Sequence, residues 1–164
     1  MIEMKVAGIA LDAVSRSPIV LLKDASEPRA LPIYISQEQA KAIVNALEKQ
    51  TPPRPFTHDL IVNIFDSCDI KVERIAINSL QDNTFYASIL INNNGQIREI
   101  DARPSDAIAI AIRTKAPIWV IEEVIADASI PVDRDADEQE RQAFRSFVSN
   151  LRPDDLIRKG GYAG

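Results

Sequence analysis

Residues 103–115 read Arg-Pro-Ser-Asp-Ala-Ile-Ala-Ile-Ala-Ile-Arg-Thr-Lys, and this stretch decides how the chain folds. The strict alternation of Ile with Ala over residues 107–112 has the period of a strand, but alanine strongly favours a helix. Pro104 suits the first turn of a helix, Asp106 suits the positive end of its dipole, and Arg113 suits the opposite end. We therefore predict a helix, which should be deeply buried because it is apolar on most sides.

Strands are predicted on both sides of this helix. Three precede it, at Ile70–Leu80, Thr84–Ile91 and Ile97–Ala102. The turn signals between them are rich in Asn, Asp and Gly, so an antiparallel meander is the natural arrangement. Pro117 stops the helix at its C-terminal end, and Ile118–Ile121 is predicted as a short inner strand.

The N-terminal part of the chain carries further strands and two helices. The predicted strands are Lys5–Val14 and Pro18–Lys23, which form a hairpin, and Leu31–Ile35. Ser36 is predicted to cap a helix that continues through Lys49, where prolines in residues 51–55 forbid continuation. Thr57 is predicted to cap the second helix.

These elements together predict an α+β fold, a single domain with a mixed, largely antiparallel sheet packed against about four helices. The last helix is expected at Asp137–Leu151, where apolar residues fall at helical spacing. We expect residues 1–126 to form the body of the domain and residues 127–151 to form an acidic loop and C-terminal helix packed on it. Residues 152–164 are expected to be a loosely held tail.

The composition is that of a soluble globular protein, because 46% of the 164 residues are hydrophobic and 26% are charged. The chain has no apolar stretch long enough to cross a bilayer and does not begin like a cleavable signal. We therefore expect a cytoplasmic protein with no membrane contact. The single cysteine, Cys68, excludes a disulfide framework and any zinc site built from several thiolates, and it is predicted to be buried.

The formal net charge of −5 argues against a surface that binds phosphates over its whole extent. Part of the acidic surplus is local, because residues 127–140 hold six carboxylates against one arginine. If nucleic acid binds this protein, it must bind to a local patch.

A first candidate site surrounds the only histidine, in the segment Arg54-Pro55-Phe56-Thr57-His58-Asp59-Leu60. In the functional interpretation His58 is a general base or metal ligand and Asp59 is a metal ligand or orienting carboxylate. In the structural interpretation Thr57 caps the helix, His58 is solvated and Asp59 interacts with the helix dipole. Adjacent helical residues point about 100° apart, so His58 and Asp59 cannot easily share one metal.

A second candidate site is Asp101-Ala102-Arg103-Pro104-Ser105-Asp106, at the start of the predicted buried helix. It would bind phosphate through Arg103, Ser105 and free backbone amides, and a divalent cation through Asp101 and Asp106. The structural alternative is a buried salt bridge, with Asp106 paired to Arg103, together with a helix cap. Because both candidate segments open helices that pack on one sheet, we predict that they lie close together.

Four ordered segments resemble the bifunctional nuclease domain family: Leu31-Pro32-Ile33-Tyr34-Ile35, Arg54 to Leu60, Asp82 to Ala87, and Asp101 to Ala107. The resemblance runs from about Met4 to Val124, most of the chain. It implies an enzyme that cleaves both DNA and RNA, so these nucleic acids are the expected partners.

One position departs from the family pattern. A Glu-Ala pair usually follows the Leu-Pro-Ile strand in the family, whereas this chain has Gln39-Ala40. Gln39 cannot act as a base or an anionic ligand. The neighbouring Glu38 is expected to point to another face of the helix. Tyr86 and Trp119 could stack on bases, and core packing is predicted for Trp119.

The leading hypothesis is therefore a nuclease that depends on a divalent metal, with Mg²⁺ held by Asp59, Asp101 and Asp106. His58 would deprotonate water, and Arg54, Arg103 and Ser105 would bind phosphate. A noncatalytic nucleic-acid, nucleotide or regulatory module is the alternative, favoured by the lone histidine and the low positive charge. A structural protein that assembles through exposed strand edges is a third class, and a homo-oligomer is expected.

Overall fold

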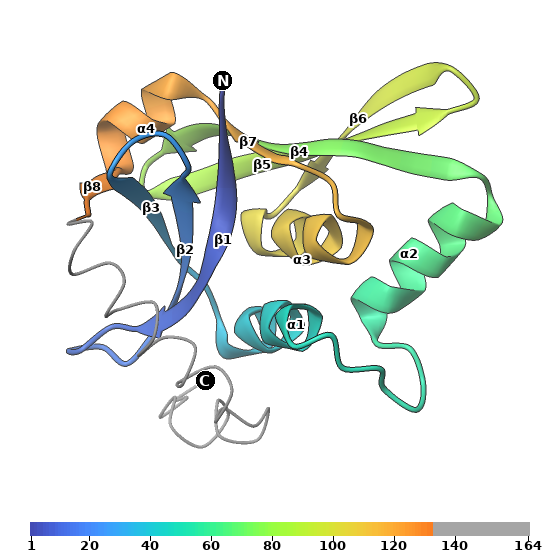
Figure 1. The fold of residues 1–164 in the computed structure, drawn as a ribbon, viewed down its shortest axis with the longest axis horizontal. Helices are drawn as coiled ribbons and strands as arrows, with labels where there is room; N and C mark the ends of the chain where they lie inside the picture. Colours follow the sequence, from blue (N-terminus) through green and yellow to red (C-terminus); the bar gives the residue numbers. More distant parts are fainter. Residues whose placement is uncertain (133–164) are drawn as a thin grey trace.

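A computed structural model describes residues 1–132, which form eight strands and four helices (Figure 1). The strands are β1 (Ile2–Leu11), β2 (Pro18–Asp24), β3 (Arg29–Tyr34), β4 (Ile70–Gln81), β5 (Thr84–Asn93), β6 (Gln96–Ala102), β7 (Ile118–Val120) and β8 (Ile130–Pro131). The helices are α1 (Gln37–Leu47), α2 (Thr57–Ser67), α3 (Pro104–Thr114) and α4 (Glu122–Ala128).

All eight strands belong to one sheet in the order β6-β5-β4-β7-β1-β2-β3-β8. The β4–β7 pair is parallel and the other pairs are antiparallel. The sheet is strongly twisted, so the β4-β5-β6 meander crosses the β1-β2-β3 strands at a large angle (Figure 1). These observations confirm the predicted single α+β domain with a mixed, largely antiparallel sheet.

The Ile-Ala run forms the central helix α3, as predicted. Pro104 is its first residue, and Ile108 and Ala109 have no exposed surface. The helix ends at Lys115, whose left-handed φ of 59° breaks the helical hydrogen-bond pattern. Burial of apolar surface on several sides of α3 stabilises both the helix and its contact with the sheet.

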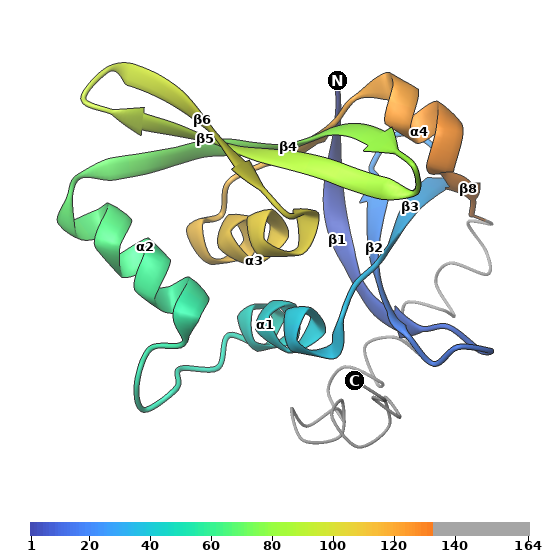
Figure 2. The same cartoon turned by 180° about the vertical axis from the view of Figure 1, so that it is seen from behind.

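Helices α1 and α3 lie side by side beneath one face of the sheet in both views (Figures 1 and 2). Ser36 begins α1 with a capping box: its hydroxyl accepts from the backbone N–H of Gln39, and the Gln39 side chain accepts from the backbone N–H of Ser36. Ile43 and Val44 are buried against the core. The predicted cap at Ser36 is therefore confirmed.

Helix α2 lies at the margin of the domain, against α3 and β4, and none of its residues is fully buried. Its cap differs from the prediction. Phe56, not Thr57, is the N-cap residue, and the Asp59 carboxylate accepts a hydrogen bond from the Phe56 backbone N–H. Cys68, which follows α2, is exposed and not buried as predicted, because α2 turns this end of the helix away from the core.

Other differences concern the ends of elements. Strand β1 begins and ends about three residues earlier than predicted, because Asp12 accepts hydrogen bonds from the backbone N–H groups of Val14 and Ser15 and starts the turn there. Helix α4 and strand β8 were not predicted. Each is short, and α4 buries only Val124 and Ile125, which is too few residues for a clear helical period.

The predicted helix Asp137–Leu151 and the tail 152–164 lie outside the described residues, so the division of the chain at residues 126 and 151 stays a prediction. Within residues 1–132 no helix is both long and apolar enough to span a bilayer. Trp119 is half-buried in β7, between β1 and β4, and does not join the fully buried core.

Candidate functional site at the starts of three helices

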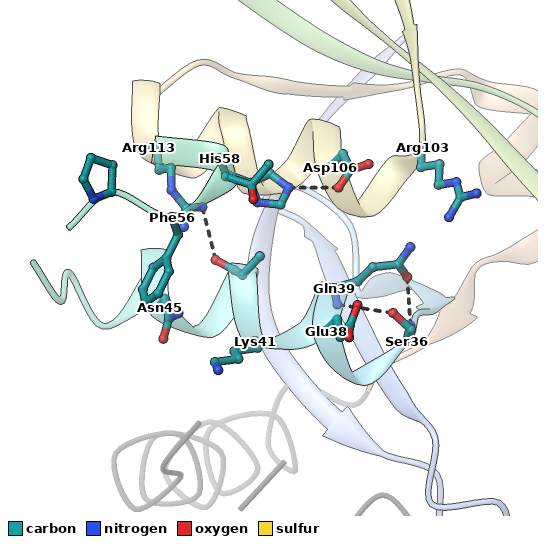
Figure 3. A pocket seen from close by; sticks show the side chains of 13 residues that line it. Ser36, Glu38, Gln39, Lys41, Asn45, Phe56, His58, Arg103, Asp106 and Arg113 are labelled. Carbon is teal, nitrogen blue, oxygen red and sulfur yellow. Dashed lines mark hydrogen bonds and ion pairs between the residues drawn. The ribbon is translucent and has the colours of Figure 1, made fainter. Parts of the chain in front are cut away.

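A hollow of about 610 Å³ opens between α1, the first turn of α2, and α3 (Figure 3). Its lining includes Glu38 and Gln39 from α1, His58 from α2, and Arg103 and Asp106 from the start of α3. The two segments singled out in the sequence therefore meet in one place. This confirms the predicted proximity of residues 54–59 and 101–106.

The contact between the two segments is a hydrogen bond of 2.8 Å between Nε2 of His58 and Oδ1 of Asp106 (Figure 3). The His58 side chain is 15% exposed, whereas that of Asp106 is 46% exposed. His58 is therefore not the solvated residue of the structural interpretation. Its ring is held in a fixed orientation beside a carboxylate that still faces solvent.

Asp59 is directed away from this hollow and forms an ion pair with Arg113 at the far end of α3. Arg113 Nε donates to Asp59 Oδ1 over 2.8 Å, and the Phe56 N–H donates to Oδ2 over 3.0 Å. Burial would raise the pKa of the Asp59 carboxyl, but these two hydrogen bonds and the positive charge of Arg113 lower the pKa below its ordinary value. One oxygen of Asp59 thus holds α2 on α3, and the other closes the first turn of α2.

Arg113 was not predicted as a site residue, and its role is structural. Its side chain is only 9% exposed and also donates to the carbonyl oxygens of Ala42 and Ala109. In the sequence, Arg113 lies at the C-terminal end of a buried helix. A cation there is explained by its favourable interaction with the helix dipole, so nothing marks Arg113 as a partner of another residue. Its partner Asp59 lies 54 positions away, and no spacing pattern indicates such a pair.

Of the three residues predicted to bind phosphate, only Arg103 lines the hollow. Arg103 lines the hollow and makes no ion pair within the described part of the chain, so its guanidinium is available to an anion. Ser105 is buried in α3, and Arg54 is exposed but does not line the hollow. The alternative of a buried pair between Arg103 and Asp106 is not what the structure contains, because Asp106 bonds to His58.

The three carboxylates predicted to hold a metal do not come together. Asp59 is bound to Arg113, and Asp101 lies exposed on β6, outside the hollow. Across residues 1–132, no three His, Cys, Asp or Glu side chains are grouped closely enough to hold a metal ion. Of the three predicted carboxylates, only Asp106 faces the hollow, together with Glu38, which was not predicted to do so.

Comparison with known proteins places this chain in a family. The family model described as "Bifunctional nuclease domain" matches residues 20–133, which is more than half of the chain. The chain belongs to the bifunctional nuclease domain family. An uncharacterized protein of Mycobacterium tuberculosis is 38% identical over 94% of this chain and 97% of its own length.

Plant proteins named bifunctional nuclease are more distant relatives of this bifunctional nuclease domain. Bifunctional nuclease 1 of Oryza sativa subsp. japonica is 27% identical over 66% of this chain, and bifunctional nuclease 1 of Arabidopsis thaliana is 26% identical over the same share. The chain spans about a third of the length of these plant proteins, 34% in both cases.

In this bifunctional nuclease domain, the structure explains why Gln39 can stand where the family usually has glutamate. The Gln39 side-chain oxygen closes the capping box with Ser36, a role that glutamate fills equally well. The amide nitrogen of the same side chain points toward the hollow (Figure 3). Glutamine therefore keeps the helix cap and removes one negative charge from the hollow. Glu38 faces the same hollow and supplies a carboxylate one residue earlier.

The helix starts around the hollow also favour anions. Within residues 1–132, neither α2 nor α3 has a side-chain hydrogen bond from its N-cap residue to the first backbone amides. Such unsatisfied N–H groups, together with the positive end of the helix dipole, attract phosphate. Arg103 and Lys41 add full positive charges to the same hollow.

Proposed function

We propose that this domain hydrolyses phosphodiester bonds in DNA and RNA, with the scissile phosphate bound in the hollow between α1, α2 and α3. The observation that carries the proposal is the 2.8 Å contact of the single histidine, His58, with Asp106, beside Arg103, which makes no ion pair within residues 1–132. A base, an orienting carboxylate and a phosphate-binding cation are the groups that this reaction requires.

His58 serves as the general base in this proposal. When Nε2–H donates to Asp106, the neutral ring keeps Nδ1 as its proton acceptor. Asp106 thereby selects the tautomer and stabilises the imidazolium that forms when His58 removes a proton from the attacking water. Arg103 and the free amides at the helix starts would hold the phosphate oxygens, where negative charge increases in the transition state.

The carboxylates that face the hollow fit Mg²⁺, because this ion does not need a complete set of protein ligands. Mg²⁺ commonly binds through one or two carboxylates together with substrate phosphates and waters, without a complete protein cage. Asp106 and Glu38 are the carboxylates that face the hollow. When bound there, the cation would neutralise charge on the phosphate.

The direct test is cleavage of labelled single-stranded DNA and RNA by the purified chain, with Mg²⁺ and with EDTA in its place. We expect cleavage with Mg²⁺ and little with EDTA. A His58→Ala preparation purified in the same way controls for contaminating nucleases. Equal cleavage by the two preparations, or none by either, contradicts the proposal.

A noncatalytic nucleic-acid-binding or regulatory module is the second candidate. It is favoured by the absence of a three-ligand metal cluster in residues 1–132 and by the engagement of Asp59 in a structural ion pair. Such a module would bind the same labelled strands without shortening them. Binding without cleavage under every divalent cation tested would therefore favour this candidate.

Substitution of Asp106 by Asn separates a metal-binding role from a structural one. We expect Asp106→Asn to lower the cleavage rate about tenfold, with partial recovery in excess Mg²⁺, because the amide keeps the size but loses the charge that attracts a hard cation. The melting temperature should barely move, since the side chain is 46% exposed and Asn suits helix starts. A large loss of stability without metal rescue would instead make Asp106 an architectural residue.

A further inference from the structure

A second hollow of about 570 Å³ adjoins the first. The two share three lining residues: Asn45 on α1, Phe56 before α2, and Arg113 on α3. From this junction the second hollow continues along the C-terminal ends of α1 and α3, where Lys49 and Lys115 line it. The two hollows therefore adjoin at these residues, and together, under the name helix groove, they offer more room than a single phosphate requires.

The charge of the helix groove is opposite to that of the whole chain. Its lining holds five cationic side chains and three carboxylates, although the chain has a formal net charge of −5. Four of the cations make no ion pair within residues 1–132, namely Lys41, Lys49, Arg103 and Lys115. This is the local patch that a phosphate backbone needs on an otherwise acidic protein.

An aromatic ring stands where the two hollows meet. Phe56 is 46% exposed and borders both of them, and Figure 3 shows its ring on the far side of His58 from Arg103. What distinguishes Phe56 from other exposed apolar side chains is its place in the lining of both hollows, where a flat partner can cover the ring. The flat face of a nucleobase is a suitable partner, because aromatic rings stack on bases of any sequence.

The backbone that carries this ring is fixed on both sides. Pro55 precedes Phe56 and restricts the local backbone. The Phe56 N–H donates to Asp59, whose other carboxylate oxygen is bound by the buried Arg113. A backbone held in this way loses little additional freedom when a base stacks on the ring that it carries, which favours binding.

We propose that the helix groove binds a single strand of nucleic acid, with one base stacked on Phe56 and the flanking phosphates held by cations in each hollow. This inference rests on the proposed function, which places the scissile phosphate near His58, and it adds the substrate class. In a duplex both faces of each base are covered by its neighbours, so Phe56 has no free face to contact. The strand must therefore be unpaired.

The test is fluorescence anisotropy with a labelled single-stranded DNA of about 12 nucleotides, and with the same strand in a duplex, in EDTA so that nothing is cleaved. We expect the wild-type chain to bind the single strand at least about tenfold more tightly than the duplex. Phe56→Leu should weaken single-strand binding about tenfold, and Phe56→Trp should retain it, because only an aromatic ring provides the stacking surface.

Tyr86 provides the matched control. It is 44% exposed, close to the value for Phe56, but it lies on β5 and borders neither hollow. We expect Tyr86→Leu to leave the affinity for the single strand unchanged. Circular dichroism should show that both leucine variants keep the wild-type melting temperature, because each replaces an exposed side chain.

Failure of this inference is distinguishable from failure of the proposed function. Bis-p-nitrophenyl phosphate is a small phosphodiester that contains no nucleobase. Its hydrolysis by the wild-type chain therefore reports phosphodiesterase activity independently of base stacking. The inference is overturned if the single strand does not bind, if duplex and single strand bind equally, or if Phe56→Leu and Tyr86→Leu have the same effect. Selective binding that depends on Phe56 supports it even when the small diester is not hydrolysed.

Discussion

Replacement of His58 by Ala is expected to lower the rate of phosphodiester cleavage by about 100-fold or more, the usual contribution of a general base. The imidazole is held by Asp106 at 2.8 Å beside a hollow that also presents Arg103. The chain contains no other histidine, so no neighbouring imidazole can replace it. The measurement is the initial rate of cleavage of a labelled strand under saturating substrate.

Two controls make this result specific to proton transfer. The melting temperature of His58→Ala should stay close to that of the wild type, since its partner Asp106 remains half-exposed and hydrated. Added imidazole should restore part of the lost rate, because a free base can enter the cavity left by the ring. Wild-type rates in the variant would assign His58 a structural role, and a lost rate that imidazole cannot restore would argue against a base.

The fold was largely predictable because the signals that define it are local. The Ile-Ala run of residues 107–112, flanked by Pro104 and Pro117, could form a buried helix wherever the rest of the chain lay. The meander of β4, β5 and β6 followed from turn residues between apolar segments. Helix α4 has neither signal, since its seven residues bury two side chains and its N-cap is Ile121, which offers no capping oxygen.

The site was predictable only as a meeting of two segments. Both segments begin helices that pack on one sheet, which indicated that the segments would lie close together. It did not indicate which of their side chains would touch. The rotation of α2 about its own axis decides this point, because it directs His58 toward Asp106 and the next residue, Asp59, toward Arg113. That rotation is set by packing of α2 on α3 and β4, which residues in sequence order do not reveal.

The same orientation of α2 explains why the predicted metal site does not form and why Phe56 lies at the junction of the two hollows, which the sequence did not indicate. With Asp59 turned to Arg113, the three predicted carboxylate ligands no longer converge, and the Phe56 ring is placed at the junction of the two hollows. In the sequence, Phe56 is one aromatic residue between a proline and a threonine. The predicted homo-oligomer stays a prediction, and size-exclusion chromatography with light scattering would test it.

Substitution of Asp59 by Asn is expected to lower the free energy of unfolding by about 2 kcal/mol near neutral pH. The loss should fall below that of a fully buried ion pair because Asp59 is about a quarter exposed, whereas Arg113 is only 9% exposed. Asn can still accept a hydrogen bond, but the buried guanidinium loses its counter-charge. Urea unfolding monitored by circular dichroism gives the difference directly.

The pH dependence identifies the cause of this loss. Because the folded structure lowers the pKa of the Asp59 carboxyl, its contribution to stability is fully present above the ordinary carboxyl range and is lost as the pH falls through the lower, folded value. The difference between wild type and Asp59→Asn should therefore be full near neutral pH and should shrink below about pH 4. A difference that stays constant with pH would mean that packing, not charge, is lost.

A double-mutant cycle assigns the energy to the pair. Arg113→Met keeps an apolar stem on α3 while removing the charge, so Asp59→Asn should cost much less in that background than in the wild type. Asp24→Asn, which breaks the separate ion pair with Arg29, should instead cost the same in both backgrounds. If Asp59→Asn costs as much without Arg113 as with it, the pair does not hold α2 on α3. The orientation of His58 and Phe56 at the groove would then need another physical cause.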